Sequence, residues 1–375
     1  MAQVSIDGDG HLNRLINNFF QQKAGGDYDL NSLNALRAFM GYILDPKQAE
    51  LKKKKVALLF ICLNQPYWQY IAPAVQGARQ FFLPGHQVDH FLWSDIPMTD
   101  TPEYLASLEK LLTQEQIMKE VEKGVVTEIQ YPNVYLKPTV SPNQFLSRES
   151  VINGVNEVRN IKDLTIFPTE PIEWPYPTLW RFHLFSQQAD KLKDYDYVFF
   201  CDADMKFVGV VGDEILGEGL TAAQHPMYAF KDGLHFPYES NPKSTAYIKR
   251  PGMFGLKNGQ NFFQPFYYAG GFQGGKAKDF LAAAEKIKEM IDTDDRENHY
   301  IARWNDESYW NRYLADNPPT TILSPSYVYP DSMIETYYIP LWGRNYPPKL
   351  ITLTKPFSLK QLTPEEMKAN EQRGI

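Results

Sequence analysis

Residues 195–206 read YDYVFFCDADMK and combine the features of a buried strand with two carboxylates at its end. Its first half, from Tyr197 to Cys201, is aromatic and β-branched, which is typical of a strand buried on both faces of a parallel sheet. The run stops at two carboxylates, Asp202 and Asp204. Ligands of open α/β sheets bind at the carboxyl ends of strands, and carboxylates there are costly to desolvate without a cation between them. The stretch therefore predicts a central strand ending at a site for Mn²⁺ or Mg²⁺ on a substrate phosphate. Taken alone, Asp-x-Asp also fits a polar turn after a strand, so the surroundings must decide.

The composition indicates a globular α/β protein. The chain has 375 residues, enough for one large or two smaller domains, with 43% hydrophobic and 22% charged residues. The net charge of −7 argues against a general nucleic-acid binder, which needs a basic face. Aromatic residues make up 14%, which suits sugar or base stacking as well as an aromatic core.

The number of cysteines and the lengths of the apolar runs indicate the cellular compartment in which the protein is expected. Cys62 and Cys201 each fall at or near a predicted strand end, so we expect buried free thiols rather than a disulfide framework. The amino terminus lacks the basic and apolar regions of a signal peptide, and the longest apolar run, 56–63, is too short for a transmembrane segment. We therefore expect a cytoplasmic protein.

The first part of the α/β domain has the pattern strand, helix, strand, at residues 56–63, 69–82 and 87–93. This order is typical of the start of a nucleotide-binding α/β unit. No Gly-rich phosphate loop follows the first strand, so Phe60 and Tyr67 are candidates to hold the base. Before this unit, residues 1–54 form a predicted helical N-terminal extension; residues 356–375 form a polar tail.

Further elements are predicted from periodicity and from strand-like runs. Helix 179–192 carries Arg181 toward the central strand, and four glycines in 270–275 allow close approach of the backbone to a ligand. Residues 131–160 read as irregular, and Asp292, Asp294 and Asp295 as surface charge at a helix end. The other predicted helices are 104–123, 276–291 and 302–314, and the other strands are 125–130, 164–167, 220–224 and 321–323.

Several local motifs occur together in one order. They are DADM at 202–205, HP at 225–226, STAYI at 244–248, FYYAGGF at 266–272, WNDES at 304–308 and ILSP at 322–325. Together they resemble glycosyltransferase family 6, the family of the histo-blood-group A and B transferases and the α-1,3-galactosyltransferases. The resemblance covers roughly residues 55–355, and it is strongest from Leu192 to Tyr327 and weak between 97 and 177.

The resemblance implies a GT-A type fold with a mixed central sheet flanked by helices, spanning 55–355. It also implies a retaining transferase that moves N-acetylgalactosamine (GalNAc) or galactose (Gal) from a UDP-sugar, in α-1,3 linkage, to a galactoside. By the same resemblance Asp202 and Asp204 hold Mn²⁺ on the diphosphate. On the donor side the matching positions are Phe60, Tyr67 and Arg181, and Ala203, between the two aspartates, is a donor-binding candidate with them. Lys355, in the tail, is a further candidate that would add positive charge when a lid closes, although a solvated surface lysine is the more common interpretation.

The remaining matches concern catalysis and acceptor binding. Glu307 matches the family's catalytic glutamate, either as a nucleophile or as a carboxylate that stabilises a front-side attack. His225, Trp304 and Asp306 match substrate-contacting positions, although His225 alone reads as structural and Trp304 alone as core. Asn305 replaces the histidine usual at its position.

The triplet Ala269-Gly270-Gly271 falls where the family distinguishes donors. Its small side chains leave room for an acetamido group and favour UDP-GalNAc, with UDP-Gal left open because one pocket residue changes specificity by only about 1–3 kcal/mol. Two other classes remain: a UDP-sugar or carbohydrate-binding protein that has kept the pocket, and a UDP-sugar hydrolase. The joint presence of Asp202, Asp204, Arg181 and Glu307 favours the transferase, because a binding protein does not need all four.

Overall fold

The computed structural model describes residues 53–122, 146–229, 235–249, 256–257, 260–261, 266–333 and 347–354. The predicted extension 1–54, apart from its last two residues, lies outside these ranges, and so do the predicted strand 125–130, Lys355 and the tail 356–375. Among the described helices, none combines the length and the apolar character that crossing a bilayer requires.

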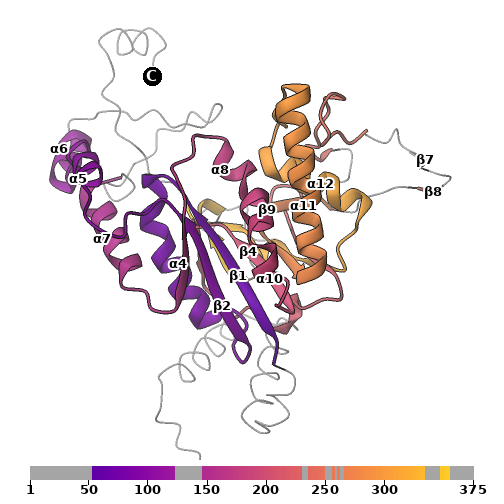
Figure 1. Ribbon diagram of the computed structural model, residues 1–375, viewed down its shortest axis with the longest axis horizontal. Coiled ribbons are helices and arrows are strands. Elements are labelled where there is room, and N and C mark those ends of the chain that lie inside the picture. Colours follow the sequence, from indigo (N-terminus) through magenta and orange to yellow (C-terminus); the bar gives the residue numbers. More distant parts are fainter. Residues whose placement is uncertain are drawn as a thin grey trace, which may run out of the picture.

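The described part of the chain is built on a seven-stranded mixed sheet with the order β10-β6-β9-β4-β1-β2-β3 (Figure 1). Strand β9 runs antiparallel to both of its neighbours, and the other strand pairs are parallel. The predicted GT-A type α/β architecture is confirmed. The strands are β1 (Lys55–Cys62), β2 (Gln87–Ser94), β3 (Leu164–Pro168), β4 (Tyr197–Cys201), β6 (Leu220–Gln224), β9 (Tyr268–Lys276) and β10 (Thr321–Leu323).

Helices cover both faces of this sheet. Alternate residues of β1 serve two cores: Leu58 packs with α4 and α7, whereas Leu59 packs with α9 to α12. Strand β4 is buried along its whole length, as its composition predicts. Cys62 and Cys201 are buried thiols, also as predicted. The helices are α4 (Trp68–Phe81), α5 (Pro102–Glu109), α6 (Gln114–Glu122), α7 (Arg148–Arg159), α8 (Tyr176–Leu179), α9 (Arg181–Gln187), α10 (Ala189–Leu192), α11 (Ala277–Thr293) and α12 (Asn305–Asp316).

A small three-stranded sheet joins the C-terminal segment to the chain that follows β4. Strand β12 (Leu350–Thr352) pairs antiparallel with β5 (Met205–Phe207) and parallel with β11 (Tyr329–Pro330). This pairing places residues 350–354 next to the two predicted metal ligands. A two-stranded hairpin, β7 (Leu256–Lys257) and β8 (Gln260–Asn261), lies at one side of the molecule (Figure 1).

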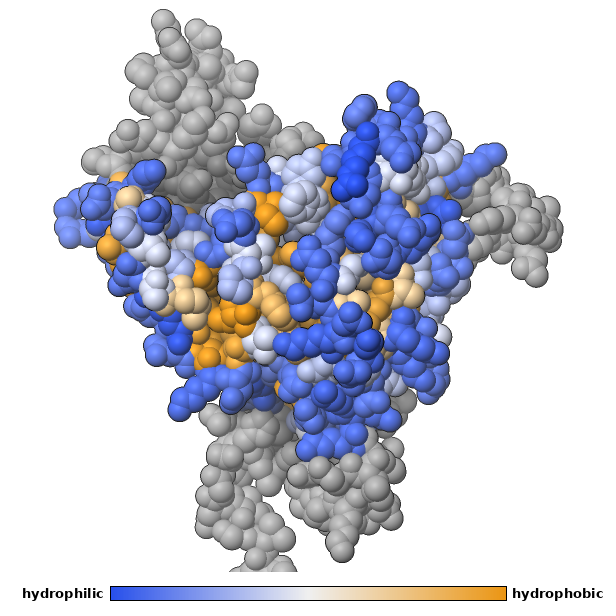
Figure 2. Space-filling model, viewed as in Figure 1, coloured by the Kyte–Doolittle hydropathy of each residue, from blue (hydrophilic) through white to orange (hydrophobic). Residues whose placement is uncertain are grey.

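Figure 2 gives the distribution of hydropathy on one face of the molecule. Hydrophilic side chains cover most of this face, and hydrophobic ones gather in its middle, over β1 and β2. The partly buried side chains of Ile61 and Phe167 extend the adjoining core cluster toward the surface. This pattern fits a sheet whose central strands are packed on both sides and whose outer strand, β3, is only partly covered.

The structure corrects three expectations about secondary structure. The predicted helix 179–192 is divided into α8, α9 and α10, with breaks at Trp180 (ψ 0°) and Gln188 (ψ 14°). Helix α7 lies in the stretch predicted to be irregular, and Ser147 caps its start by accepting a hydrogen bond from the Ser150 N–H. The glycine-rich stretch, for which the sequence predicts no secondary structure, is strand β9.

Candidate active site

Asp202 and Asp204 follow β4 at the carboxyl end of the sheet, where the sequence predicts a ligand site. The Asp202 N–H donates to the Gly271 carbonyl at 2.9 Å, and the Leu353 N–H donates to the Asp204 carbonyl at 2.8 Å. The Asp204 side chain is buried and that of Asp202 is partly exposed. The turn is thus fixed from one side by β9 and from the other by the C-terminal segment.

Arg181 joins the carboxylates of two different elements. Its Nη2 donates to Asp202 Oδ1 at 3.2 Å, and its Nη1 lies 3.1 Å from both Asp306 Oδ2 and the Gly270 carbonyl oxygen. The guanidinium also lies over the Phe200 ring, 4.4 Å from its centroid. Burial by itself lowers the pKa of Arg181, but the negative charges of Asp306 and Asp202 outweigh it and raise the pKa above its ordinary value. The break between α8 and α9 places this cation in the centre of the site.

Glu307 lies in the first turn of α12 and points its carboxyl group at β9. Its Oε2 accepts a hydrogen bond from the Gly270 N–H at 2.9 Å. Burial raises the pKa of Glu307 to about 8, against the lowering effect of the Gly270 N–H, and the charge of Asp306 adds to the rise. Burial also raises the pKa of Asp306 to about 6, with Arg181 opposing the shift. Two neighbouring carboxyl groups of raised pKa at a strand end are typical of a functional site.

The two glycines of the triplet leave space for protein carboxylates. A Cβ on Gly270 would lie 2.8 Å from Asp306 Oδ2, and a Cβ on Gly271 would lie 3.1 Å from Asp202 Oδ2. Ala269 is buried beside them. These small residues were expected to allow close approach of a ligand. In the structure they also allow Asp306 of α12 and Asp202, after β4, to lie against β9.

The residues predicted to contact the nucleotide differ in their burial and in their distance from the two aspartates. Tyr67 is partly buried in the turn between β1 and α4. Burial and the charge of Asp204 raise the pKa of Tyr70, and nearby Tyr67 adds to the rise. Ala203 is buried between the two aspartates. The Phe60 side chain is fully buried in the core that includes α4, and the structure does not bring its ring to the carboxylate cluster.

The structure connects one predicted acceptor residue, His225, to Glu307 through Tyr267. The His225 N–H donates to the Tyr267 carbonyl at 2.8 Å, and its ring centroid is 5.8 Å from that of Tyr267. The buried Tyr267 hydroxyl lies close to Glu307, and it has no hydrogen bond of normal geometry within the described residues. Trp304, just before α12, is 43% exposed, so the core interpretation of this side chain is wrong.

The residues present fit a divalent cation shared with a substrate. Within the described residues no three His, Cys, Asp or Glu side chains converge as a complete protein cage. Mg²⁺ and similar ions in phosphate-transferring sites are held by one or two carboxylates together with substrate oxygens. Asp202 and Asp204 supply such oxygen donors at the carboxyl end of β4.

Sequence reasoning missed three residues that shape the site. Asp294 was expected at the surface, and it is fully buried: it accepts hydrogen bonds from the Ser244 hydroxyl (2.6 Å), the Thr245 N–H (2.7 Å) and the Tyr309 hydroxyl (2.9 Å). Tyr267 gave no signal beyond a run of aromatics. Asn311 was detectable, because it lies four residues after Glu307 and therefore on the same helix face.

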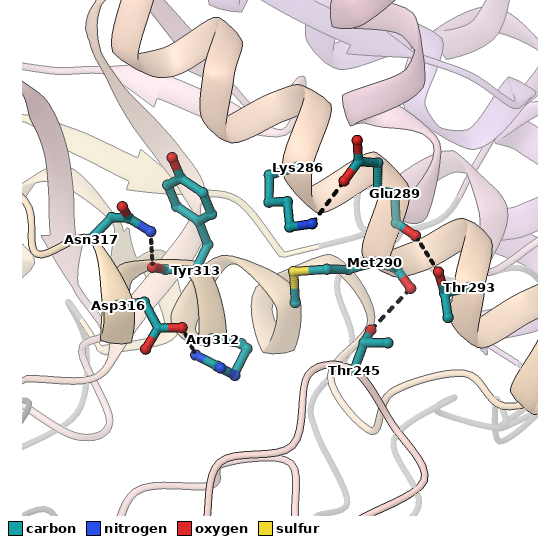
Figure 3. Close-up of a pocket in the computed structure, with 9 residues that line it drawn as sticks. All are labelled: Thr245, Lys286, Glu289, Met290, Thr293, Arg312, Tyr313, Asp316 and Asn317. Carbon is teal, nitrogen blue, oxygen red and sulfur yellow. Dashed lines mark hydrogen bonds and ion pairs between the residues drawn. The ribbon is translucent and has the colours of Figure 1, made fainter. Parts of the chain in front are cut away.

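A cavity of about 390 Å³ lies between α11 and α12, away from this chemistry (Figure 3). Its α12 residues, such as Arg312 and Asp316, lie on the helix face opposite Glu307. Both of its cations are paired, Lys286 with Glu289 at 2.8 Å and Arg312 with Asp316 at 2.6 Å. The cavity is therefore separate from the site formed by Asp202, Arg181 and Glu307. Its lining is Thr245, Lys286, Glu289, Met290, Thr293, Arg312, Tyr313, Asp316 and Asn317.

Comparisons with known proteins agree with this geometry. The model of glycosyltransferase family 6 matches residues 155–339. The histo-blood group ABO system transferase 1 of Rattus norvegicus is 34% identical over 288 residues, 77% of this chain and 64% of the relative. The globoside alpha-1,3-N-acetylgalactosaminyltransferase 1 of Gallus gallus is 35% identical over 265 residues, 71% of this chain and 59% of the relative.

A bacterial relative is covered more completely. The O-antigen biosynthesis glycosyltransferase WbnI of Escherichia coli is 31% identical over 183 residues, 48% of this chain and 69% of the relative. The two animal proteins are thus matched over less than two thirds of their own length, and the bacterial one over more. The family match contains β3, β4, β6, β9 and β10, the turn after β4 and the first turn of α12, and the chain belongs to glycosyltransferase family 6.

Proposed function

We propose that the protein is a metal-dependent retaining glycosyltransferase that moves GalNAc, or else Gal, from a UDP-sugar to a galactoside in α-1,3 linkage. The observation that carries the proposal is the chain of contacts Asp202–Arg181–Asp306, with Glu307 held beside it by the Gly270 N–H. These groups provide a charged site for a diphosphate leaving group and, next to it, a carboxylate for the reacting sugar.

The leaving UDP needs its developing negative charge neutralised. Asp202 and Asp204 would hold the cation, which when bound supplies Lewis-acid stabilisation of the diphosphate. Arg181 adds a fixed positive charge, and its planar fork keeps Asp202 and Asp306 in place. Because these groups are arranged before substrate binds, little reorganisation is needed as charge develops.

The transition state at the sugar is oxocarbenium-like, so a nearby carboxylate stabilises it. Glu307 takes this role, because its carboxyl group is oriented by Gly270 toward the strand that carries the donor triplet. In the substrate-free protein its pKa of about 8 keeps much of it protonated at neutral pH. A neighbouring cation and a positively charged sugar both favour the ionised form.

On the acceptor side, Trp304 offers an exposed ring for stacking on a sugar, and His225 approaches Glu307 through Tyr267. On the donor side, the small triplet Ala269-Gly270-Gly271 favours GalNAc. The Gallus gallus relative is named as an N-acetylgalactosaminyltransferase, which supports this choice.

The test measures UDP release from UDP-GalNAc and UDP-Gal, with Mn²⁺ or with EDTA, and with or without galactoside acceptors such as lactose. Release that requires Mn²⁺ and increases with acceptor supports transfer, and the faster donor identifies the sugar. Release that ignores the acceptor supports a hydrolase. UDP binding without release from either donor supports a binding protein.

Two variants assign roles within the same assay. Asp204→Asn should abolish Mn²⁺-dependent release, and unchanged activity in the presence of EDTA would refute the metal role. Glu307→Gln should lower turnover by orders of magnitude while UDP affinity stays close to that of the wild type. A loss of UDP affinity in Glu307→Gln would move this residue from catalysis to binding.

A further inference from the structure

Asn311, fully buried in the middle of α12, forms hydrogen bonds to two elements of the site. Its Oδ1 accepts from the Tyr268 N–H at 2.9 Å, and its Nδ2 donates to the Tyr268 carbonyl at 2.7 Å. The same Nδ2 also donates to the Glu307 carbonyl at 2.9 Å. The carboxamide therefore pairs with one residue of β9 in the way that a peptide group of a neighbouring strand would.

This contact replaces a missing strand. Strand β4 ends at Cys201, opposite Phe272, so β9 extends past its neighbour on that edge. The Tyr267 carbonyl accepts from the His225 N–H, on the β6 edge, and alternate residues of a strand face opposite edges. The polar backbone groups of Tyr268 consequently face the edge that β4 has left, and Asn311 satisfies them.

Helix α12 attaches to this edge at two points. Glu307 accepts from the Gly270 N–H and Asn311 binds Tyr268, so residues four apart on the helix meet residues two apart on the strand. Residues four apart lie on one helix face, and residues two apart on a strand face the same side, so both contacts form together. Ala269, the first residue of the donor triplet, lies between the two points.

Resting on the function proposed above, we infer that Asn311 is a positioning residue that fixes the donor triplet relative to Glu307. Without its amide, the buried N–H and carbonyl of Tyr268 would be unpaired, and unpaired buried polar groups destabilise the arrangement that contains them. The start of β9 would then move to find other partners. Small misplacements of reacting groups reduce turnover steeply, and the acetamido space next to Ala269 would change shape in the same movement.

Two variants of Asn311 test the inference. Asn311→Asp keeps the acceptor for the Tyr268 N–H and loses both donated bonds, whereas Asn311→Leu has similar volume and loses all three. Asn317→Asp and Asn317→Leu are matched controls, because Asn317 is exposed just after the same helix and its side-chain amide donates to the Tyr313 carbonyl, away from β9. Should Asn311→Leu fail to fold, Asn311→Asp still tests the proposal.

The measurements are affinities of UDP, UDP-GalNAc and UDP-Gal by calorimetry, and turnover with each donor, with and without lactose. For the Asn311 variants we expect UDP affinity close to wild type, kcat lowered by roughly 10- to 100-fold, and the GalNAc-to-Gal ratio of affinity and turnover changed by about tenfold. The Asn317 variants should match the wild type.

Each other result counts against a specific statement. If the Asn311 variants keep the wild-type donor ratio and lose activity only in proportion to folded protein, Asn311 is structural and the inference is wrong. If the wild-type protein binds UDP but neither discriminates nor turns over the two sugar nucleotides, the proposed function fails, and the inference falls with it.

Discussion

Arg181 Nη2 lies 3.2 Å from Asp202 Oδ1, and this contact ties the helix before β4 to the carboxylate after it. The same guanidinium reaches Asp306, at the start of a helix about a hundred residues further along the chain. One buried cation therefore compensates two acids that would otherwise repel each other. Several of the predictions below depend on this arrangement.

Two replacements of Arg181 should distinguish the effect of its positive charge from the effect of its planar guanidinium geometry. Arg181→Met leaves Asp202 and Asp306 without a cation, so we expect a loss of about 3–5 kcal/mol in the free energy of unfolding. Arg181→Lys keeps the charge, but one ammonium group cannot replace the planar fork, so turnover should fall by about 100-fold with a smaller loss of stability. Urea unfolding and UDP release measure the two effects. Arg296→Lys, at an ion pair with Asp292 in which the arginine side chain is largely exposed, is the control and should change the free energy of unfolding by less than about 1 kcal/mol.

The two glycines of the triplet should differ in their tolerance of alanine. A Cβ at Gly270 would lie 2.8 Å from Asp306 Oδ2, an atom held by Arg181, so Gly270→Ala should lower turnover by about 100-fold. A Cβ at Gly271 would lie 3.1 Å from Asp202 Oδ2, on a partly exposed side chain that can give way, so Gly271→Ala should cost about tenfold. UDP-release rates, corrected for folded protein, compare the pair. The reverse ranking would contradict the placement of Asp306.

Stability should depend on pH through Glu307. Its pKa rises from the ordinary 4.5 to about 8 in the folded protein, so between these values the folded chain binds more protons than the unfolded chain. The contribution to stability is complete below about pH 4.5 and is lost as pH rises through about 8, with a slope of at most about 1.4 kcal/mol per pH unit.

Urea unfolding at pH 5, 7 and 9 checks this dependence. Glu307→Gln lacks the titrating group, so its free energy of unfolding should gain on the wild type by a few kcal/mol between pH 5 and pH 9. Asp306, whose pKa of about 6 gives a similar but smaller effect, is present in both proteins and cancels in the difference. Parallel pH profiles for the two proteins would mean that Glu307 titrates normally.

The backbone of Asn305 should restrict what can replace it. Its φ is 46°, in the left-handed region that Asn and His tolerate and β-branched residues avoid. Asn305→Val should therefore destabilise the protein by about 1–3 kcal/mol and disturb the first turn of α12, whereas Asn305→His should be nearly neutral. Asn317→Val, at φ −129°, is the control for the change of side chain. Equal unfolding midpoints for the two Val variants would contradict the strain argument.

The sequence predicts the central sheet well because its buried strands are short apolar runs with punctuated ends. Strands β1, β2, β3, β4, β6 and β10 lie where they were expected, and α4 and α11 match within a few residues. The strand end alone pointed to Asp202 and Asp204. The family resemblance, not periodicity, supplied Glu307, because nothing local distinguishes it from other helix-surface acids. The structure brings Asp202, Arg181, Gly270, Asp306 and Glu307 together.

Strand β9 was missed because glycine disfavours strands and a propensity argument cannot detect crowding. A Cβ at Gly274 would lie 2.3 Å from a ring carbon of Phe199, so packing between β9 and β4 requires glycine. Helix α7 was missed although its signals were present: Ser147 caps it, and Val151, Val155 and Val158 repeat at helical spacing. The Pro-rich and Asn-rich stretch before it concealed them.

Beyond the end of β4, the edge of β9 pairs with α12 instead of with a strand. This pairing has a consequence for how the protein can diversify. The carboxylate of Glu307 accepts from the Gly270 N–H of the sheet, and the Glu307 backbone carbonyl accepts from the Asn311 amide. Trp304, three residues earlier, is exposed on the segment that leads into the helix. Under the proposed function Trp304 contacts the acceptor, so selection can remodel that segment, and with it the choice of acceptor glycan, without disturbing the reaction centre. A single scaffold can in this way acquire new glycan products while its chemistry stays the same.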